Sequence, residues 1–422
     1  MCTSTAYALN RWVLIATFGS SLSATAAQPA AADVITDWDE KGIEAVVPLT
    51  RSTSPYMAQR MMGMLHLAMF DAVNSIESRY RPYLVQLPAD PGTSKEAAAA
   101  AAGATILASI DAKTATAMNA ALAKYIEQIP DGPAKVEGIK LGQAIAAKVV
   151  EARANDGSEA ADDYRPKTTP GAYVSTTPMR GPTWPLVKPF VMTKGSQFRP
   201  GPPILLNSGQ WAKDFNEIKD YGALTNSKRN AQQTETAHFW LMAGPEAYHP
   251  FAREITKAKQ MSVVESARFM ALVGVALNDS LIAVLDAKYH YKFWRPVTAI
   301  RNGDIDDNPS TERDATWLPL VNTPMHPEYP CAHCIESGSV AGVVEAVLGG
   351  DEIPEVAMTS PTAPGVTHRW TNMAAFTEEV ANARVWAGFH YRSSTRVATE
   401  MGRQIGEYVV KNVMQPAETA SR

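Results

Sequence analysis

The sequence predicts an all-α protein built as a bundle of helices. Apolar residues recur at spacings of three and four along most of the chain, which is the periodicity of an amphipathic helix. A half-buried strand would instead alternate apolar and polar residues, and the sequence has no alternating run of useful length. Hydrophobic residues make up 45% of the 422 residues, enough for a sizeable core.

The individual helices follow from this periodicity and from their end signals. Residues 54–77 repeat apolar side chains with helical spacing, and His66 within them is expected to be packed or exposed rather than a ligand. A second long helix, 262–292, starts at Ser262 with Glu265 three residues later, the pattern of a capping box. Further helices are expected at 95–110, 113–128, 134–154, 209–219, 228–243, 331–348, 372–388 and 394–413.

Two proline-rich stretches interrupt the helices. Residues 160–207 are expected to form a long covering loop, and residues 296–330 an irregular connection. Because neither stretch contains a convincing strand, we expect one all-α domain over residues 28–413, followed by a frayed tail at 414–422.

The N-terminus resembles an export signal. Arg11 is the only charged residue before Asp33, and it precedes the apolar run "WVLIATFG" and a small-residue stretch containing Ala24-Thr25-Ala26. We therefore expect a signal peptide at 1–27 and a secreted or periplasmic protein, although a simple alanine-rich leader would look similar. The apolar run is too short to span a bilayer comfortably, so stable membrane insertion is not expected. The net charge of −4 gives no strong attraction to nucleic acid.

The segment "HPEYPCAHC" raises the question of what Cys331-Ala332-His333-Cys334 does. Three interpretations are open: a zinc site, a redox pair, or a catalytic histidine between two cysteines. A zinc site needs four ligands, and cleavage of the signal would leave only these two cysteines. A redox pair of the thioredoxin type belongs in a βαβ setting, which the sequence does not predict. If the protein is exported, the two cysteines are expected to form a disulfide.

Two pairs of cationic residues accompany this segment. Lys288 and Arg295 are seven residues apart, so a helix ending at Pro296 would present both on one face. Arg384 and His390 are six apart, and Gly388 between them suggests a helix end around which both turn inward.

These cations need an anionic partner. Asp279 and Asp286 could be the carboxylates that orient Lys288 and Arg295, or they could be ordinary surface acids. His333 would lie in the first turn of helix 331–348, where free N–H groups and the helix dipole favour an anion. The three segments could therefore converge on one oxyanion.

Taken in order, the three segments resemble a known signature. Lys288 with Arg295-Pro296, then Pro330-Cys331-Ala332-His333, then Arg384 with His390 are similar to the three-part motif of the vanadium-dependent haloperoxidases, which the type 2 phosphatidic acid phosphatases share. The segments "FWRPVTAIR" and "HPEYP" most resemble the bacterial haloperoxidase-like branch. The resemblance implies an all-α fold of two four-helix bundles around a vanadate or phosphate site.

The resemblance also implies a cofactor and a reaction. Vanadate would be the cofactor, with His390 as the residue that binds vanadium. Hydrogen peroxide would oxidise a halide to hypohalous acid, which reacts with a small organic substrate. By the same resemblance His333 is the acid–base residue, and His326 occupies a position that tunes which halides react. We therefore expect iodide and bromide to be oxidised, and chloride hardly at all.

The remaining implied roles concern the oxyanion. Lys288, Arg295 and Arg384 would hold the vanadate oxygens, Lys288 would assist catalysis, and the backbone N–H of Ala332 would add a contact. Two departures from the motif weaken the match. Cys331 and Ala332 replace a serine and a glycine, and Ser394 stands where the phosphatases have an aspartate that orients the nucleophilic histidine. The alternatives are a secreted acid phosphatase with His390 as nucleophile, and a catalytically silent anion-binding protein.

Overall fold

A computed structural model describes residues 1–3, 33–52, 55–162, 164–175 and 177–417. The chain from Asp33 onward forms one compact unit. The expected signal peptide lies almost entirely outside the described residues. The helices are α1 (Val34–Ser52), α2 (Pro55–Glu77), α3 (Lys95–Ala108), α4 (Ala112–Ile126), α5 (Pro133–Arg153), α6 (Gly209–Tyr221), α7 (Ala231–Phe239), α8 (Pro245–Ala258), α9 (Val263–Tyr291), α10 (Pro296–Arg301), α11 (Ala332–Leu348), α12 (Met373–Trp386) and α13 (Arg392–Asn412).

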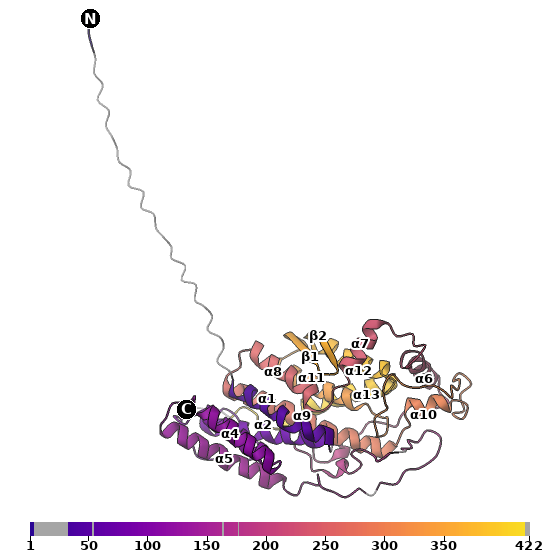
Figure 1. Cartoon of the computed structure of the whole chain (residues 1–422), viewed down its shortest axis with the longest axis horizontal. Helices are drawn as coiled ribbons and strands as arrows, with labels where there is room; N and C mark the ends of the chain where they lie inside the picture. Colours follow the sequence, from indigo (N-terminus) through magenta and orange to yellow (C-terminus); the bar gives the residue numbers. More distant parts are fainter. Residues whose placement is uncertain (4–32, 53–54, 163, 176, 418–422) are drawn as a thin grey trace. The chain divides into compact units, whose positions relative to one another are not determined.

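Helix α9 is the central element. It packs against α2 on the side where α1, α3, α4 and α5 gather, and against α11 and α13 on the other (Figure 1). Its length and apolar composition would suffice to cross a membrane, but 94% of its most apolar window is buried inside the protein. The capping box expected at Ser262 and Glu265 is present. The mostly helical fold confirms the predicted fold class.

Helices α11 and α13 cross at very close range. A Cβ atom added to Gly402 would lie 2.1 Å from the carbonyl oxygen of Ile335, and one added to Gly338 would lie 2.2 Å from that of Thr399. Only glycine allows two helix backbones to approach this closely. The contact fixes the beginning of α11 relative to the beginning of α13, and both ends carry histidines of the predicted site.

The proline-rich stretch after α5 covers α9, and two aspartates of α9 anchor it. Asp279 accepts the backbone N–H groups of Phe190, Val191 and Met192 at 2.6 to 2.8 Å. Asp286 forms a two-point ion pair with Arg199, at 2.7 and 2.9 Å. The suggestion that these aspartates orient Lys288 and Arg295 was therefore wrong: they hold the covering loop in place. Short 3₁₀ turns, Trp184–Leu186 and Gly195–Phe198, lie in this loop.

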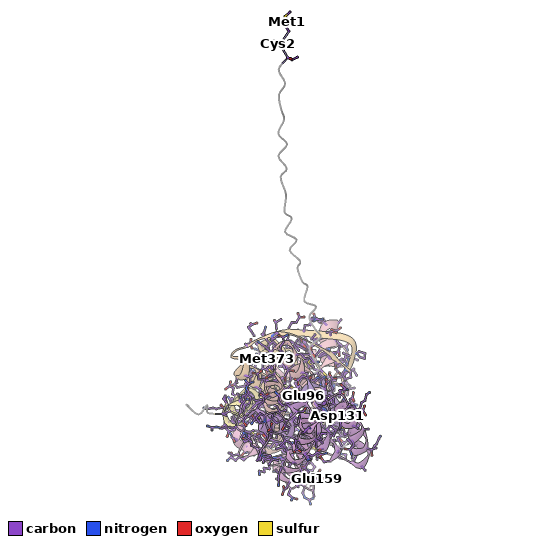
Figure 2. The ribbon with its side chains drawn as sticks, turned by 90° about the vertical axis from the view of Figure 1, so that its left-hand side faces the viewer. Met1, Cys2, Glu96, Asp131, Glu159 and Met373 are labelled. Atoms are coloured by element: carbon purple, nitrogen blue, oxygen red, sulfur yellow. The ribbon has the colours of Figure 1, made fainter. Side chains whose placement is uncertain are left out.

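A two-stranded antiparallel hairpin departs from the all-helical expectation. Strands β1 (Glu352–Ser360) and β2 (Ala363–Asn372) pair between α11 and α12. Val356, Met358 and Ser360 alternate inward, so a period of two exists, but only over five residues. Figure 2 shows Met373, at the base of the hairpin, on the opposite side of the body from Glu159, which follows α5. Helices α1, α8 and α10 were also not predicted.

The end of the chain is more ordered than expected up to residue 417. Met414 is buried, Pro416 forms an antiparallel bridge with Tyr80, and Arg81 donates its backbone N–H to the carbonyl of Gln415 at 2.8 Å. Fraying was expected from residue 414, whereas these contacts tie residues 414–417 to the segment after α2. Residues 418–422 lie outside the described part.

Candidate functional site

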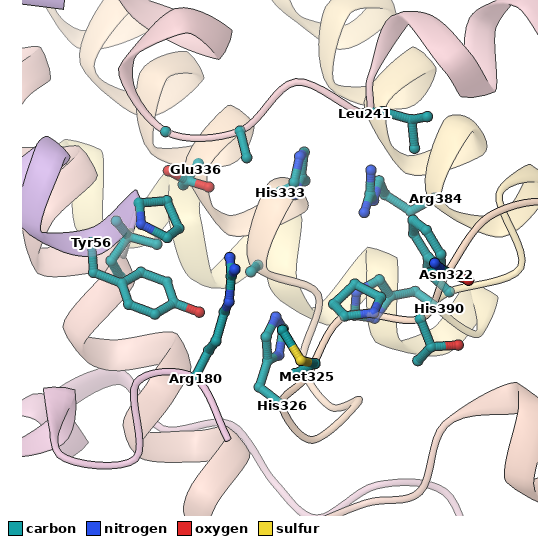
Figure 3. Close-up of a pocket in the computed structure, with 18 of the residues that line it drawn as sticks. Tyr56, Arg180, Leu241, Asn322, Met325, His326, His333, Glu336, Arg384 and His390 are labelled. Carbon is teal, nitrogen blue, oxygen red and sulfur yellow. The ribbon is translucent and has the colours of Figure 1, made fainter. Parts of the chain in front are cut away.

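A cavity of about 360 Å³ brings the predicted site residues together. Ala332 and His333 reach it from the start of α11, His326 from the preceding connection, Arg384 from α12, and His390 from the turn before α13. Figure 3 shows His333, Arg384, His390 and His326 arranged around one space. Two of the three predicted segments therefore line one cavity, and the third is joined to them by Arg295, whose Nη1 lies 3.2 Å from His390 Nε2.

His390 presents its Nε2 atom to this site. Its Nδ1 lies 2.8 Å from Oε1 of Glu328, and the same oxygen accepts the backbone N–H of Tyr391 at 3.2 Å. A guanidinium only donates hydrogen bonds, and Arg295 Nη1 lies 3.2 Å from Nε2, so Nε2 keeps its lone pair and Nδ1 carries the proton. A neutral imidazole held in this tautomer is suited to bind a metal through Nε2.

Lys288 and Arg295 are fully buried and are not among the residues that line the cavity, but Arg295 bonds to two that do, His326 and His390. The Lys288 Nζ donates to the carbonyls of Pro327 and Glu328 at 2.9 and 2.7 Å, which leaves one N–H of its ammonium form for an anion. The Arg295 guanidinium donates to the carbonyls of His326 and Phe389, both at 2.9 Å. It thus ties the connection before α11 to the turn before α13.

The route by which these two cations meet differs from the prediction. Helix α9 ends at Tyr291, and Lys292 caps it in the left-handed conformation, with φ of 53°. Arg295 lies beyond this break, as the N-cap of α10, and Pro296 starts that helix rather than ending α9. Lys288 and Arg295 therefore both belong to the site, as predicted, but they do not lie on one face of a single helix.

Arg384 and His333 also line the cavity. Arg384 Nη1 donates to the carbonyl of Trp240 at 2.6 Å, while its buried Nε has no partner among the described residues. His333 Nε2 lies 2.9 Å from the carbonyl of Met242, which can only accept, so Nε2 carries the proton and Nδ1 is left as a base. The helix break predicted near Gly388 is present, because α12 ends at Trp386 and Gly388 has φ of 80°.

The two cysteines are free, so the structure does not contain the expected disulfide. Cys331 is the N-cap of α11, and its sulfur accepts the backbone N–H of Cys334 at 3.3 Å. Serine commonly fills this capping role, so Cys331 replaces the serine of the motif in structural terms. Ala332 is the first residue of α11, and its backbone N–H lies outside the helical hydrogen-bond ladder, where an anion could accept it.

Burial sets the electrostatics of the site. Loss of water, followed by the charge of Arg295, lowers the pKa of both Lys288 and His390 well below their ordinary values. Burial and then Arg384 lower the pKa of His333 in the same way. Burial raises the pKa of Glu328 to about 8, against the opposing pull of Lys288 and Arg295. The cluster is a concentration of buried positive charge that a bound anion would stabilise.

Comparison with known proteins shows what this chain is similar to. Residues 268–419, which carry all three motifs, match the model of the VCPO second helical-bundle domain. The vanadium chloroperoxidase of Curvularia inaequalis is 25% identical over 384 residues, covering 71% of this chain. This chain is similar to the vanadium-dependent haloperoxidases. It spans 62% of the length of that chloroperoxidase.

Solved haloperoxidase structures share the fold. A bacterial vanadium-dependent iodoperoxidase superposes with a TM-score of 0.76 at 21% identity, covering 91% of this chain and 98% of the other. An apo-type bacterial vanadium-dependent chloroperoxidase gives a TM-score of 0.68 at 17% identity, covering 85% and 92%. The similarity to the iodoperoxidase thus extends over nearly the whole compact unit.

The residues present fit a vanadate ion. His390 presents the lone pair of Nε2 beside Arg295, the ammonium form of Lys288 keeps one uncommitted N–H, and the buried Nε of Arg384 is an unsatisfied donor. Buried donors without partners are rare and costly, and an oxyanion would satisfy them. The cavity also offers the imidazole nitrogen that vanadium requires.

Sequence reasoning missed Glu328, the carboxylate that orients His390. The prediction placed this role at position 394, where Ser394 stands, and concluded that no such carboxylate was present. Glu328 instead comes from the segment "HPEYP", two residues after His326. The sequence did contain a signal for this role. Glu328 is an acidic residue between two prolines, directly before the segment that carries His333. Arg180 and Glu336, which also line the cavity, were missed as well.

A second polar cluster lies apart from this cavity. Asp39 Oδ1 is 2.7 Å from both His66 Nε2 and His249 Nδ1, and all three side chains are buried and could hold a metal ion. Its other oxygen pairs with Arg253 at 2.5 Å, so the carboxylate is already neutralised. The cluster joins α1, α2 and α8 through hydrogen bonds. His66 is buried, but it belongs to a possible metal-binding group, a role that the sequence did not predict for it.

Proposed function

We propose that this protein is a vanadate-dependent haloperoxidase that oxidises iodide and bromide with hydrogen peroxide. The observation that carries the proposal is the His390 imidazole, held by Glu328 with Nε2 directed at a buried cationic site. Bound vanadate would act as a Lewis acid that activates hydrogen peroxide toward attack by a halide. Lys288, Arg295 and Arg384 would hold its oxygens and neutralise their charge.

His333 has a separate part in this mechanism. Its Nδ1 is free to accept a proton because Nε2 is bound to the Met242 carbonyl. Because burial and Arg384 lower its pKa, His333 is neutral near pH 7 and can take a proton from incoming peroxide. The same atom can return that proton to a departing oxygen.

A phosphatase is the second candidate, and Glu328 favours it. Ser394 argued against phosphohistidine chemistry, because the orienting aspartate is missing there. Glu328 supplies an equivalent carboxylate at 2.8 Å from His390 Nδ1, so that argument fails. Vanadate resembles the phosphoryl-transfer transition state, and one cationic site can serve either reaction.

A paired assay on one preparation separates the two functions. Halide oxidation is measured with peroxide after vanadate loading, and phosphate-ester hydrolysis is measured without vanadate. We expect vanadate-dependent oxidation of iodide and bromide, lost in His390→Ala and retained in His290→Ala, a matched change at an exposed histidine outside the cavity. Ester hydrolysis that needs His390, with no halide oxidation, would establish the phosphatase instead.

The halide range is proposed from His326. This imidazole lines the cavity, with Nδ1 3.1 Å from Arg295 Nη2, so it is part of the site rather than an ordinary loop residue. A polar ring here, together with the weak donor Cys331, is expected to give a milder oxidant. Chloride gives up electrons less readily than bromide or iodide, so monochlorodimedone should be brominated but hardly chlorinated near neutral pH. Equal chlorination and bromination would contradict this role.

We also propose export to the periplasm or medium. Support comes from the sequence alone, from Arg11 and the apolar run that follows it. N-terminal sequencing of the protein recovered outside the cytoplasm should begin near residue 28. Recovery of the uncleaved chain from the cytoplasm alone would contradict it.

A further inference from the structure

We propose that the cavity holds a second site beside the oxyanion, formed by Arg180 and Glu336, which binds an aromatic organic anion of the phenolate class. The inference deepens the proposed haloperoxidase function by naming the class of its organic acceptor. The binding itself does not depend on vanadate or peroxide, so it can be tested without them.

The backbone of Arg180 is held by hydrogen bonds, while its guanidinium has no partner among the described residues. Its backbone N–H donates to the carbonyl of Met325 at 2.8 Å, and its carbonyl accepts the hydroxyl of Tyr289 at 2.6 Å. Figure 3 shows its side chain reaching into the cavity between Tyr56 and His326. Its guanidinium forms no ion pair or hydrogen bond with any residue that the structure describes. A guanidinium has five donors, and this one is available to a ligand in the cavity.

Glu336 supplies the opposite polar group. It lies one turn after His333 on α11, is only 4% exposed, and its Oε1 has no hydrogen-bond partner within the described chain. The Glu336 carboxyl group and the Arg180 guanidinium form no ion pair, so the two groups can contact different parts of one ligand. Burial raises the pKa of Glu336 well above its ordinary value, so it is a neutral acid that can donate as well as accept.

Five apolar residues line another part of the wall and leave room for a ring. Pro55, Leu241, Leu281, Val321 and Phe389 line the cavity. Its volume of about 360 Å³ lies at the lower end of the range found for sites that enclose small organic molecules, and exceeds the needs of one oxyanion. An apolar body with one anionic oxygen matches the combination of these apolar residues with Arg180 and Glu336.

The chemistry of the proposed reaction favours the same ligand class. A phenolate is more electron-rich than its phenol and attacks the halogen of hypohalous acid through a ring carbon. A carbon–halogen bond forms, the oxygen–halogen bond breaks, and the hydroxide released combines with the ring proton to give water. The halogen is reduced and the ring carbon oxidised, so no further reactant is required. Arg180 would hold the phenolate oxygen while the ring faces the oxyanion.

The test uses 4-nitrophenolate binding to the full chain by isothermal titration calorimetry, without peroxide. The pH is set so that the probe is ionised, and phosphate is present at a concentration that saturates the oxyanion site. Its uncharged methyl ether, 4-nitroanisole, is the matched ligand. Arg180→Gln removes the charge, Arg180→Lys keeps it, and Arg79→Gln is the matched control at an exposed arginine paired with Glu265. Thermal unfolding of each variant verifies the fold.

We expect 4-nitrophenolate to bind wild type and Arg79→Gln alike, and Arg180→Gln roughly ten- to a hundredfold more weakly, as for the loss of one charge-assisted contact. Arg180→Lys should recover part of the affinity, and 4-nitroanisole should not distinguish the variants. Displacement of the probe by phosphate, equal binding by Arg180→Gln, or equal binding of the two ligands would each overturn the proposal. Failure of halide oxidation with Arg180-dependent binding intact would count only against the proposed function.

Discussion

At the scale of single residues, the site depends on which nitrogen of each histidine carries a proton. His390 is fixed by the Arg295 guanidinium, which only donates, at Nε2, and His333 is fixed by the Met242 carbonyl, which only accepts, at its own Nε2. The two imidazoles are thereby held in opposite tautomers, with the lone pair on Nε2 of His390 and on Nδ1 of His333. In the proposed mechanism the first would bind vanadium and the second would transfer protons.

Glu328→Gln tests this arrangement. Glutamine keeps the shape of the side chain but cannot ionise, so it cannot supply the negative charge that Glu328 gains above its pKa of about 8 and that strengthens its hydrogen bond with Nδ1–H of His390. We expect vanadate affinity to fall about ten- to a hundredfold, as is typical when the partner of a metal-binding histidine is altered. Equilibrium dialysis of vanadate above pH 8 measures the effect, with Glu137→Gln at an exposed position of α5 as the control. Unchanged affinity would show that Glu328 has no orienting role.

At the scale of secondary-structure elements, the crossing of α11 and α13 positions the two histidines. Gly402→Ala would place a methyl group 2.1 Å from the Ile335 carbonyl and push the helices apart. Overpacking typically costs about 1–3 kcal/mol, more than the gain of up to about 1 kcal/mol from alanine's helix propensity. Urea denaturation should show this loss, together with weaker vanadate binding.

Gly209→Ala is the matched control, because no atom lies within 4 Å of a Cβ added there at the start of α6. It should leave both stability and binding nearly unchanged. If Gly402→Ala behaved like Gly209→Ala, the close approach of α11 and α13 would not be what fixes the site.

The elements also show what sequence can and cannot predict. Long periodic segments such as α2 and α9 were predicted within one residue, because burial of one helix face imposes a strong pattern. The hairpin was missed because its inward alternation spans only Val356 to Ser360. The site cations were found from charge and motif order. Glu328 and Arg180 were not, because their roles depend on how irregular connections fold back.

At the scale of the whole molecule, the buried site couples anion binding to protonation. In the anion-free protein, burial lowers the pKa of Lys288, His326, His333 and His390 well below their ordinary values. A bound anion favours the charged form of each group and raises these pKa values again. Anion binding should therefore take up protons, and affinity should increase as the pH falls.

Sulfate is a suitable probe of this coupling, because it is a tetrahedral oxyanion that does not itself titrate near neutral pH. Calorimetric titrations in buffers of different ionisation enthalpy should reveal net proton uptake. Lys288→Met should take up fewer protons, whereas Lys148→Met, at an exposed position of α5, should match the wild type. Binding enthalpies that do not depend on the buffer, or that indicate proton release, would contradict the coupling.

The most direct test of the central claim is a crystal structure of the protein soaked with vanadate, with vanadium located by its anomalous scattering. The structure described here predicts vanadium bonded to Nε2 of His390, with its oxygens facing Lys288, Arg295 and Arg384. Vanadium bound instead at Asp39, His66 and His249, or absent from a cavity that His390 still lines, would contradict the assignment of this cavity as the vanadate site.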